Sequence, residues 1–153
     1  MKSFWHSPVG WLALLASDEV LKGIKFLETK PDYYPQETNT IIQQTETELS
    51  EYFSGERKTF SIPLGPEGTD FQQTVWKELC HIPYGQTINY GQLAQKLGDI
   101  KKVRAVGRAN GQNPIPIIIP CHRVIGSDNN LVGYAGGISR KQFLLKHEGA
   151  LLL

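Results

Sequence analysis

The stretch from 114 to 126, Pro-Ile-Pro-Ile-Ile-Ile-Pro-Cys-His-Arg-Val-Ile-Gly, constrains the fold of this chain more than any other. Its three prolines fix φ at three points and exclude a regular helix. The β-branched isoleucines between them favour an extended, buried segment. Neighbouring residues of a strand point to opposite faces, so Cys121 and His122 act at one site only if the chain turns at Pro120. The sequence therefore predicts a thiol and an imidazole held at the end of a stiff, buried segment.

Cys121 has two interpretations when it is taken alone. Most free cysteines are small buried hydrophobic groups. The alternative is a thiolate nucleophile, whose pKa is lowered by His122, by a nearby cation or by a helix N-terminus. A Cys-His dipeptide by itself favours the buried structural thiol, and only the wider sequence context reverses that preference.

The residues from Pro120 to Val124, Pro-Cys-His-Arg-Val, resemble the active-site signature of the O6-alkylguanine-DNA alkyltransferases, the methylated-DNA–protein-cysteine methyltransferases. Asn113-Pro114 ahead of the signature is similar to the same family, and so are Tyr-Ala-Gly-Gly at 134–137 and Leu-Leu-Lys-His-Glu-Gly at 144–149. The resemblance runs in order and without gaps from about Phe71 to Gly149, whereas the amino-terminal part is similar only loosely.

The resemblance implies a reaction in which an alkyl group on O6 of guanine in duplex DNA moves to the sulfur of Cys121, leaving an inert thioether. O4-methylthymine is a second substrate to consider. His122 would accept the thiol proton through a water, and Glu148 would orient His122 and stabilise its imidazolium. Tyr90 would donate a proton or hydrogen bond to the leaving base. Asn113 would tie the segment before the cysteine to the DNA-binding helices. No cofactor is implied.

The resemblance also implies how DNA is held. The target atom lies inside a base stack, so the nucleotide must be flipped out, and Arg104 matches the family's arginine finger, which enters the duplex through the minor groove. A serine occupies the position of Ala135 in some relatives, so one hydrogen-bond donor to O6 is in doubt here. The predicted base pocket consists of Val132, Gly133, Tyr134 and Ala135, and the predicted DNA-binding residues are Lys101, Lys102, Arg104, Arg108 and Arg123. For Arg123, which lies beside the Cys-His pair, a structural role is the alternative to a phosphate contact.

Charge is divided unevenly along the chain. Residues 1–85 carry 7 Lys/Arg and 12 Asp/Glu, whereas residues 86–153 carry 9 and 3. An acidic first part and a basic second part indicate that the second part meets a polyanion. The cations clustered between Lys101 and Arg108 favour a nucleic-acid interface over random surface variation.

Residue patterns in the first part predict a small α+β unit. Apolar runs at 11–16 and 20–26 across a polar turn predict a hairpin. Apolar residues near helical spacing predict a helix from Thr40 to Phe53. The alternating segment from Phe60 to Leu64 predicts an edge strand, because Pro63 excludes a central one.

The second part reads as mostly helical. Thr69 and Gln72 form a capping box that begins a helix, on which Cys80 is expected to be a buried structural thiol. A helix capped by Asn89 and a second helix over 101–110, joined by a turn with Gly98, predict a helix-turn-helix. A final helix is expected over 138–147, with Ser139 as a candidate cap.

The predicted fold class is therefore an α+β protein of two lobes. Residues 1–66 form the first lobe, for which the resemblance implies a ribonuclease-H-like fold. Residues 67–153 form a winged helix-turn-helix lobe that carries the active-site cysteine and binds double-stranded DNA containing O6-alkylguanine.

Cysteine usage and hydropathy suggest a location. Cys80 and Cys121 are the only cysteines. With no signal peptide evident and no apolar run that approaches a membrane span, we expect a cytoplasmic, reducing compartment, no membrane partner and a monomer. Some members of the family bind zinc through their amino-terminal lobe. No cysteine precedes Cys80 here, so we predict no metal site.

Three other functions are compatible with parts of the sequence. Alkyltransferase-like proteins share the DNA-binding architecture but replace the cysteine, usually with tryptophan, and the presence of Cys121 argues against them. A Cys-His hydrolase gives no reason for the basic helix-turn-helix. A winged-helix regulator would leave the cysteine incidental. We therefore predict a stand-alone repair protein.

Overall fold

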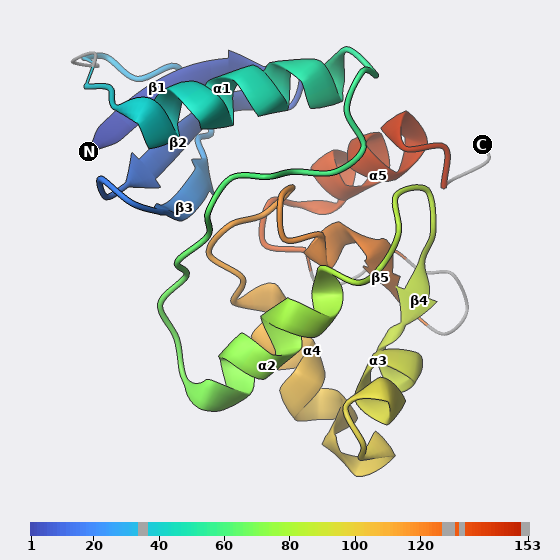
Figure 1. Ribbon diagram of the computed structural model, residues 1–153. Helices are drawn as coiled ribbons and strands as arrows, with labels where there is room; N and C mark the ends of the chain where they lie inside the picture. Colours follow the sequence, from blue (N-terminus) through green and yellow to red (C-terminus); the bar gives the residue numbers. More distant parts are fainter. Residues whose placement is uncertain (34–36, 127–130, 132–133, 151–153) are drawn as a thin grey trace. The chain divides into compact units, whose positions relative to one another are not determined.

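The computed structural model describes residues 1–33, 37–126, 131 and 134–150, and the chain divides into two compact units, Met1–Glu67 and Gly68–Leu153 (Figure 1). No helix in these described ranges is long and apolar enough to cross a membrane.

A three-stranded antiparallel sheet with the order β1-β2-β3 organises the first unit. Its strands are β1 (Lys2–Ser7), β2 (Gly10–Ala16) and β3 (Leu21–Phe26). The predicted hairpin is confirmed as β2 and β3, and β1 pairs with the other edge of β2. Leu12 and Leu14 of this central strand are fully buried, because the strand has a neighbour on both edges and α1 packs against the sheet (Figure 1).

The predicted helix from Thr40 to Phe53 is confirmed as α1 (Thr40–Phe53). Asn39 caps it, because its side-chain oxygen accepts from the Ile42 amide at 2.8 Å. The buried residues recur at helical spacing and face the sheet: Ile41, Ile42, Thr45, Glu48, Leu49 and Tyr52.

The predicted edge strand from Phe60 to Leu64 is wrong, because only an isolated parallel bridge at Leu64 joins this segment to β3. The amide of Ser61 donates to the buried Glu48 carboxylate of α1 at 2.7 Å, so it is not available to a neighbouring strand. Pro63 has no amide hydrogen to offer. The segment is held to its unit by this side chain and by two backbone hydrogen bonds to Leu21, and not by a continuous ladder.

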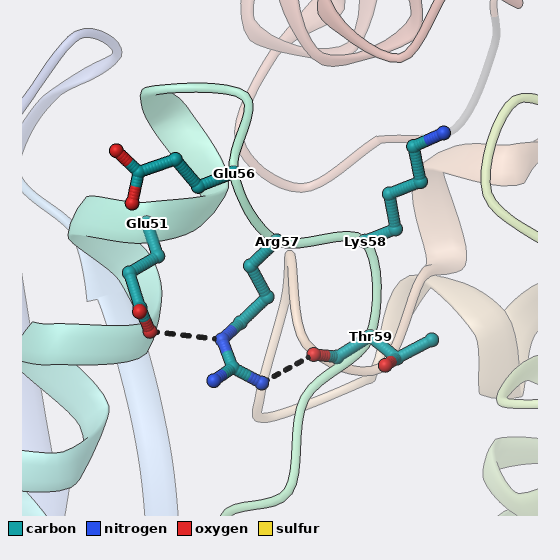
Figure 2. Close-up of a pocket in the computed structure, with 5 residues that line it drawn as sticks. All are labelled: Glu51, Glu56, Arg57, Lys58 and Thr59. Atoms are coloured by element: carbon teal, nitrogen blue, oxygen red, sulfur yellow. Dashed lines mark hydrogen bonds and ion pairs between the residues drawn. The ribbon is translucent and has the colours of Figure 1, made fainter.

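A pocket of about 240 Å³ lies just beyond the end of α1 (Figure 2). Its arginine is engaged by hydrogen bonds, because Arg57 Nε donates to Glu51 at 3.0 Å and its Nη1 to the Thr59 carbonyl at 2.9 Å. The pocket belongs to the first unit, and none of the predicted site residues lines it. The lining residues are Glu51, Glu56, Arg57, Lys58 and Thr59.

The second unit begins with α2 (Asp70–Leu79), and the predicted capping box is confirmed. Thr69 Oγ1 accepts from the Gln72 amide at 3.1 Å, and Gln72 Oε1 accepts from the Thr69 amide at 2.9 Å. Trp76 on this helix donates its indole N–H to the Ala109 carbonyl at 2.8 Å. This buried bond fixes α2 against the later helix that carries Ala109.

The predicted helix-turn-helix consists of α3 (Tyr90–Lys96) and α4 (Val103–Gly111), which pack against each other. Asn89 and Gln92 form the capping box of α3, and Gly98, at φ 95°, makes the turn that follows it. The second helix begins later than predicted, since Ile100–Lys102 form a 3₁₀ turn, η1, whose cap is Asp99.

Two short strands join the helix-turn-helix to the segment that follows Cys121. β4 (Ile88–Asn89) pairs in parallel with β5 (Val124–Ile125), with Ile88 opposite Val124. β5 follows directly on a 3₁₀ turn, η2 (Cys121–Arg123). The start of α3 therefore lies beside the chain that carries the cysteine.

Two local predictions in the second unit are wrong. Cys80 is the exposed C-cap of α2 and not a buried thiol, because it falls just beyond the helix's apolar stripe. The final helix, α5 (Ile138–His147), is confirmed, but its N-cap is Gly137 and no side chain caps it. Ser139 is already within the helix.

We predict that Thr69→Ala destabilises the protein by about 1 kcal/mol, because it leaves the amide of Gln72 without its capping acceptor. The free energy of unfolding in urea measures the loss. The matched control is Thr74→Ala on the same helix, whose hydroxyl only donates back to the Asp70 carbonyl and which should change stability by less than about 0.5 kcal/mol. Equal losses in the two variants would contradict the capping argument.

Candidate active site

The segment from Pro114 to Pro120 is mostly buried, as predicted, but the prediction that it is extended is wrong. The Ile119 amide donates to the Ile115 carbonyl at 2.9 Å, and the Cys121 amide donates to the Ile119 carbonyl at 2.8 Å, so the chain folds back on itself. Ile117 has φ 73°, a conformation that strains a β-branched residue, and its fully buried side chain offsets that strain. A proline fixes φ at a value that turns and strands share. The three prolines of this segment therefore excluded a helix but did not distinguish a strand from a turn.

Asn113 holds both ends of this loop. Its Nδ2 donates to the Ile119 carbonyl at 2.7 Å, and its Oδ1 accepts from the Ile115 amide at 3.0 Å. Since Asn113 follows the C-cap of α4, these two bonds attach the loop before Cys121 to the end of that helix.

Cys121 begins η2 and is buried. Burial raises the pKa of its thiol to about 11, although a hydrogen bond from the Asn113 side chain and the positive charge of Lys141 favour the thiolate. The expectation of a lowered pKa is therefore wrong for this structure, because the cost of burying a charge exceeds both favourable interactions. The resting thiol is protonated at neutral pH.

His122 and Glu148 meet in the interior, with Nε2 of the imidazole 2.8 Å from Oε2 of the carboxylate. Since a carboxylate only accepts hydrogen bonds, Nε2 carries the proton of the neutral ring. Nδ1 of His122 is buried and has no hydrogen-bond partner among the described residues. The imidazole therefore has one free basic nitrogen, and this nitrogen belongs to the residue next to the thiol.

Arg123 holds the same carboxylate from the other side. Its Nε donates to Oε1 of Glu148 at 2.8 Å and its Nη2 to Oε2 at 3.0 Å, while Nη1 donates to the Ile82 carbonyl at 2.7 Å. Of the two roles expected for Arg123, the structure favours the structural one. The prediction that it binds DNA is wrong, because its guanidinium is buried and all three of its nitrogens donate to groups inside the protein. Its contact with Glu148 makes it a positioning group for His122.

The charge states of this cluster follow from burial and pairing. Burial would raise the pKa of Glu148, but the hydrogen bonds from His122 and Arg123 outweigh it and lower the pKa to about 2. Burial lowers the pKa of His122, although the contact with Glu148 acts in the opposite direction. The carboxylate and the guanidinium are therefore charged, and the imidazole is neutral and ready to accept a proton.

Lys141 is a site residue that the sequence reasoning missed. It is fully buried on α5, and its Nζ donates to the Val124 carbonyl at 2.6 Å. Burial lowers its pKa to about 8, and the charge of Cys121 opposes that shift. A signal was present in the sequence, because Lys141 lies three and four residues before Leu144 and Leu145, on the face of the helix that their spacing predicts to be buried.

Two predicted tyrosines also lie near the thiol. Burial raises the pKa of Tyr90, at the start of α3, and the charge of Cys121 raises it further. The pKa of Tyr134 is raised well above its ordinary value, also by burial first and then by Cys121. Of the remaining predicted pocket residues, Ala135 is exposed, and Val132 and Gly133 lie outside the described residues.

Four predicted DNA-binding cations lie exposed on the second unit. Lys101 and Lys102 are on η1, and Arg104 and Arg108 are one turn apart on α4, so the two arginines share a helix face. The structure thus gathers the predicted catalytic residues in the interior and leaves these cations at the surface of the same unit.

Comparisons with known proteins match both units. Residues 1–66 match the family description "6-O-methylguanine DNA methyltransferase, ribonuclease-like domain", and residues 70–150 match "6-O-methylguanine DNA methyltransferase, DNA binding domain". The methylated-DNA–protein-cysteine methyltransferase of Methanosarcina acetivorans is 45% identical over 153 residues, covering 97% of each chain. That of Mycobacterium tuberculosis is 46% identical over 147 residues, covering 93% of this chain and 88% of the relative.

Solved structures give the same result. The crystal structure of Mycobacterium tuberculosis OGT in complex with DNA has a TM-score of 0.88 at 44% identity, and the match covers 97% of this chain and 92% of that one. The O6-methylguanine-DNA methyltransferase of the archaeon Pyrococcus kodakaraensis has a TM-score of 0.65 at 27% identity, covering 97% and 99%.

We predict that Glu148→Gln destabilises the protein by about 3–5 kcal/mol at neutral pH, because it leaves the buried guanidinium of Arg123 without its counter-charge. Urea unfolding measures the loss. The control is Glu78→Gln, which breaks the 3.4 Å contact with the exposed His81 and should cost at most about 1 kcal/mol.

The destabilisation caused by Glu148→Gln should decrease as pH falls. The folded pKa of Glu148, about 2, lies below its ordinary value of 4.5, so its stabilisation is complete above about pH 4.5 and is lost as pH falls toward 2. The stability difference between the wild type and Glu148→Gln should narrow across that window. A constant difference would contradict the assignment of a charged carboxylate.

We predict that iodoacetamide at neutral pH labels the exposed Cys80 faster than the buried, protonated Cys121. In the Lys141→Met variant, Cys121 should be labelled about ten times more slowly than in the wild type, because the substitution removes a charge that favours the thiolate. Mass spectrometry of the peptides measures both rates. Lys146→Met, an exposed change on the same helix, should have no effect, and equal rates in the two lysine variants would argue against the electrostatic role of Lys141.

Proposed function

Because the chain belongs to the 6-O-methylguanine DNA methyltransferase family, we propose that it repairs duplex DNA by moving the alkyl group from O6 of guanine to Sγ of its own Cys121, once per molecule. The family activity, alkyl transfer from methylated DNA to a protein cysteine, is that of this chain. The observation that supports the residue assignments most strongly is the buried His122–Glu148 contact of 2.8 Å beside the cysteine.

Transfer is a displacement at the alkyl carbon. The bond from that carbon to Sγ forms as its bond to O6 breaks, and the bond electrons stay with the guanine. A soft sulfur nucleophile suits this attack better than a hydroxyl does. The thiol of Cys121 must lose its proton first, and Nδ1 of His122 is the basic nitrogen that no described group occupies.

The imidazolium that forms on His122 is stabilised by charges already in place. Glu148 is ionised before the reaction, because Arg123 holds it with two hydrogen bonds. The carboxylate therefore receives the new positive charge without rearranging, which is how a preorganised site lowers a barrier. The positive charge of Lys141 favours the thiolate in the same step.

The departing guanine carries the electron pair of the broken bond and needs a proton. Tyr90 lies close enough to the sulfur for the charge of Cys121 to raise its pKa, and its hydroxyl is the donor that we propose. The proton lost by the thiol to His122 balances the proton gained by the base. The products are an unmodified guanine and a thioether on Cys121.

DNA binding follows from the exposed cations. We propose that α4 enters the minor groove, that Arg104 fills the space left by the flipped nucleotide, and that Tyr134 lines the pocket that receives it. Arg104 and Arg108 lie exposed on the helix whose end is bonded to the loop before Cys121, which supports this orientation. Affinity should fall steeply with salt, since phosphate contacts dominate it.

Three finer proposals rest on the same site. The protein acts as a monomer, because the proposed catalytic residues all come from one unit of one chain. O4-methylthymine is a second substrate, because it also carries a methyl group on an oxygen of the base edge. A reducing, cytoplasmic location suits two cysteines that are both free thiols.

The experiment is the intact mass of the protein after mixing with duplex DNA that contains one O6-methylguanine. We expect a single added methyl group, mapped by peptide analysis to Cys121, with at most one transfer per molecule. Cys121→Ser should keep DNA binding and gain no methyl, whereas Cys80→Ser should react as the wild type does. A parallel duplex with O4-methylthymine tests the second substrate.

Two outcomes would overturn the proposal. Transfer that persists in Cys121→Ser would assign the nucleophile to another residue. An unchanged mass of the wild type together with tight DNA binding would indicate damage recognition without chemistry.

A further inference from the structure

Asn110 is a buried polar residue that the proposed reaction does not use. It lies on α4 with 1% of its surface exposed, next to Ala109 and one turn after Val106, which are both buried and apolar. Its Nδ2 faces the Cys121 carbonyl at 3.4 Å, while its Oδ1 has no hydrogen-bond partner among the described residues. A buried acceptor without a partner is costly, so an apolar residue would suit this position better if stability alone decided it.

The orientation of this amide is fixed by chemistry. The carbonyl of Cys121 can only accept, so the group that faces it must be the amide nitrogen of Asn110 and not the oxygen. The nitrogen has two hydrogens, and the Cys121 carbonyl uses one of them. The second hydrogen is available to another acceptor on the same side of α4.

Tyr90 supplies that acceptor. The ring of Tyr90 lies against α4, with its Cδ1 and Cε1 at 3.6 and 3.8 Å from the place where Gly107 would carry a Cβ. Gly107 is one turn before Asn110, so the ring and the amide share a helix face. A hydrogen bond from Asn110 lowers the pKa of Tyr90, against burial and the charge of Cys121, which raise it.

We infer that Asn110 is a positioning residue that directs the phenolic proton of Tyr90 toward the bound base. Because the amide nitrogen donates to the phenol oxygen, Tyr90 has to donate its own single proton elsewhere. The orientation that points the Asn110 nitrogen at Tyr90 leaves Oδ1 of Asn110 without a hydrogen bond. The same amide donates to the backbone of Cys121. One side chain thus sets the distance between the donor to the leaving group and the nucleophile.

The amide also acts during proton transfer. As Tyr90 gives its proton to the departing guanine, negative charge develops on the phenol oxygen, and the Asn110 N–H already points at it. This inference rests on the proposed function, since it needs a leaving base that takes a proton.

The test is single-turnover transfer from duplex DNA with one O6-methylguanine, with DNA in excess over a range of concentrations. Asn110→Leu should lower the rate at saturating DNA about tenfold, the equivalent of one lost hydrogen bond, and leave the half-saturating DNA concentration unchanged. The control is Gln112→Leu, which also replaces a side-chain amide by leucine. Gln112 lies two residues away, is exposed, and among the described residues its side chain bonds only to Gln72 at 2.8 Å. It should react within about twofold of the wild type.

A double-mutant cycle separates positioning from structural support. If Asn110 acts through Tyr90, Asn110→Leu should slow a Tyr90→Phe protein by less than about twofold, because the hydroxyl it directs is already gone. A tenfold loss in both backgrounds would overturn the inference, as would a rate for Asn110→Leu within twofold of the wild type.

Asn110→Asp keeps the size of the side chain and guards against a variant that fails to fold. When its carboxyl ionises it can only accept, so it would draw the Tyr90 proton away from the base. Its transfer rate relative to the wild type should therefore fall as pH rises. A ratio independent of pH would contradict the inference, and a wild type that transfers no methyl would remove the proposed function itself.

Discussion

The second unit depends on the hydrogen bonds that His122 and Arg123 donate to the buried carboxylate of Glu148. This carboxylate accepts from His122 at 2.8 Å and from two nitrogens of Arg123 at 2.8 and 3.0 Å, and so it joins the residue after the end of α5 to the turn that carries Cys121. Removing one partner of such a cluster leaves an uncompensated charge in the interior. α5 is therefore fixed against η2, and Lys141 on that helix is placed where it can bond to Val124.

The surroundings of Cys121 bear on its proposed role as the nucleophile. Burial raises the pKa of Cys121 to about 11, which protects the sulfur from adventitious oxidation and alkylation. The groups that favour the thiolate are already in place around it: the Asn113 side chain, which donates a hydrogen bond, and the positive charge of Lys141.

Local sequence signals predicted the helices well, because caps act over three or four residues. The capping boxes at Thr69 and Asn89 are both present as written in the sequence. Two of the failures came where a distant group decided the outcome. The amide of Ser61 donates to Glu48 and not to a neighbouring strand. Arg123 points inward because it pairs with the carboxylate of Glu148, 25 residues later in the chain. Charge type alone did not separate this buried arginine from the exposed Arg104 and Arg108.

The sequence by itself determined the two-unit organisation, the helix-turn-helix, the Cys-His pair and the family, because these depend on short motifs and their order. Only the tertiary structure decided the shape of the proline-containing loop, the protonation of the thiol and the places of Lys141 and Asn110. Prolines restrict φ and leave ψ open, so Asn113 and Ile115 had to close the loop by hydrogen bonds. A pKa and a proton's direction depend on groups brought together from different helices, and no spacing along the chain reports that distance.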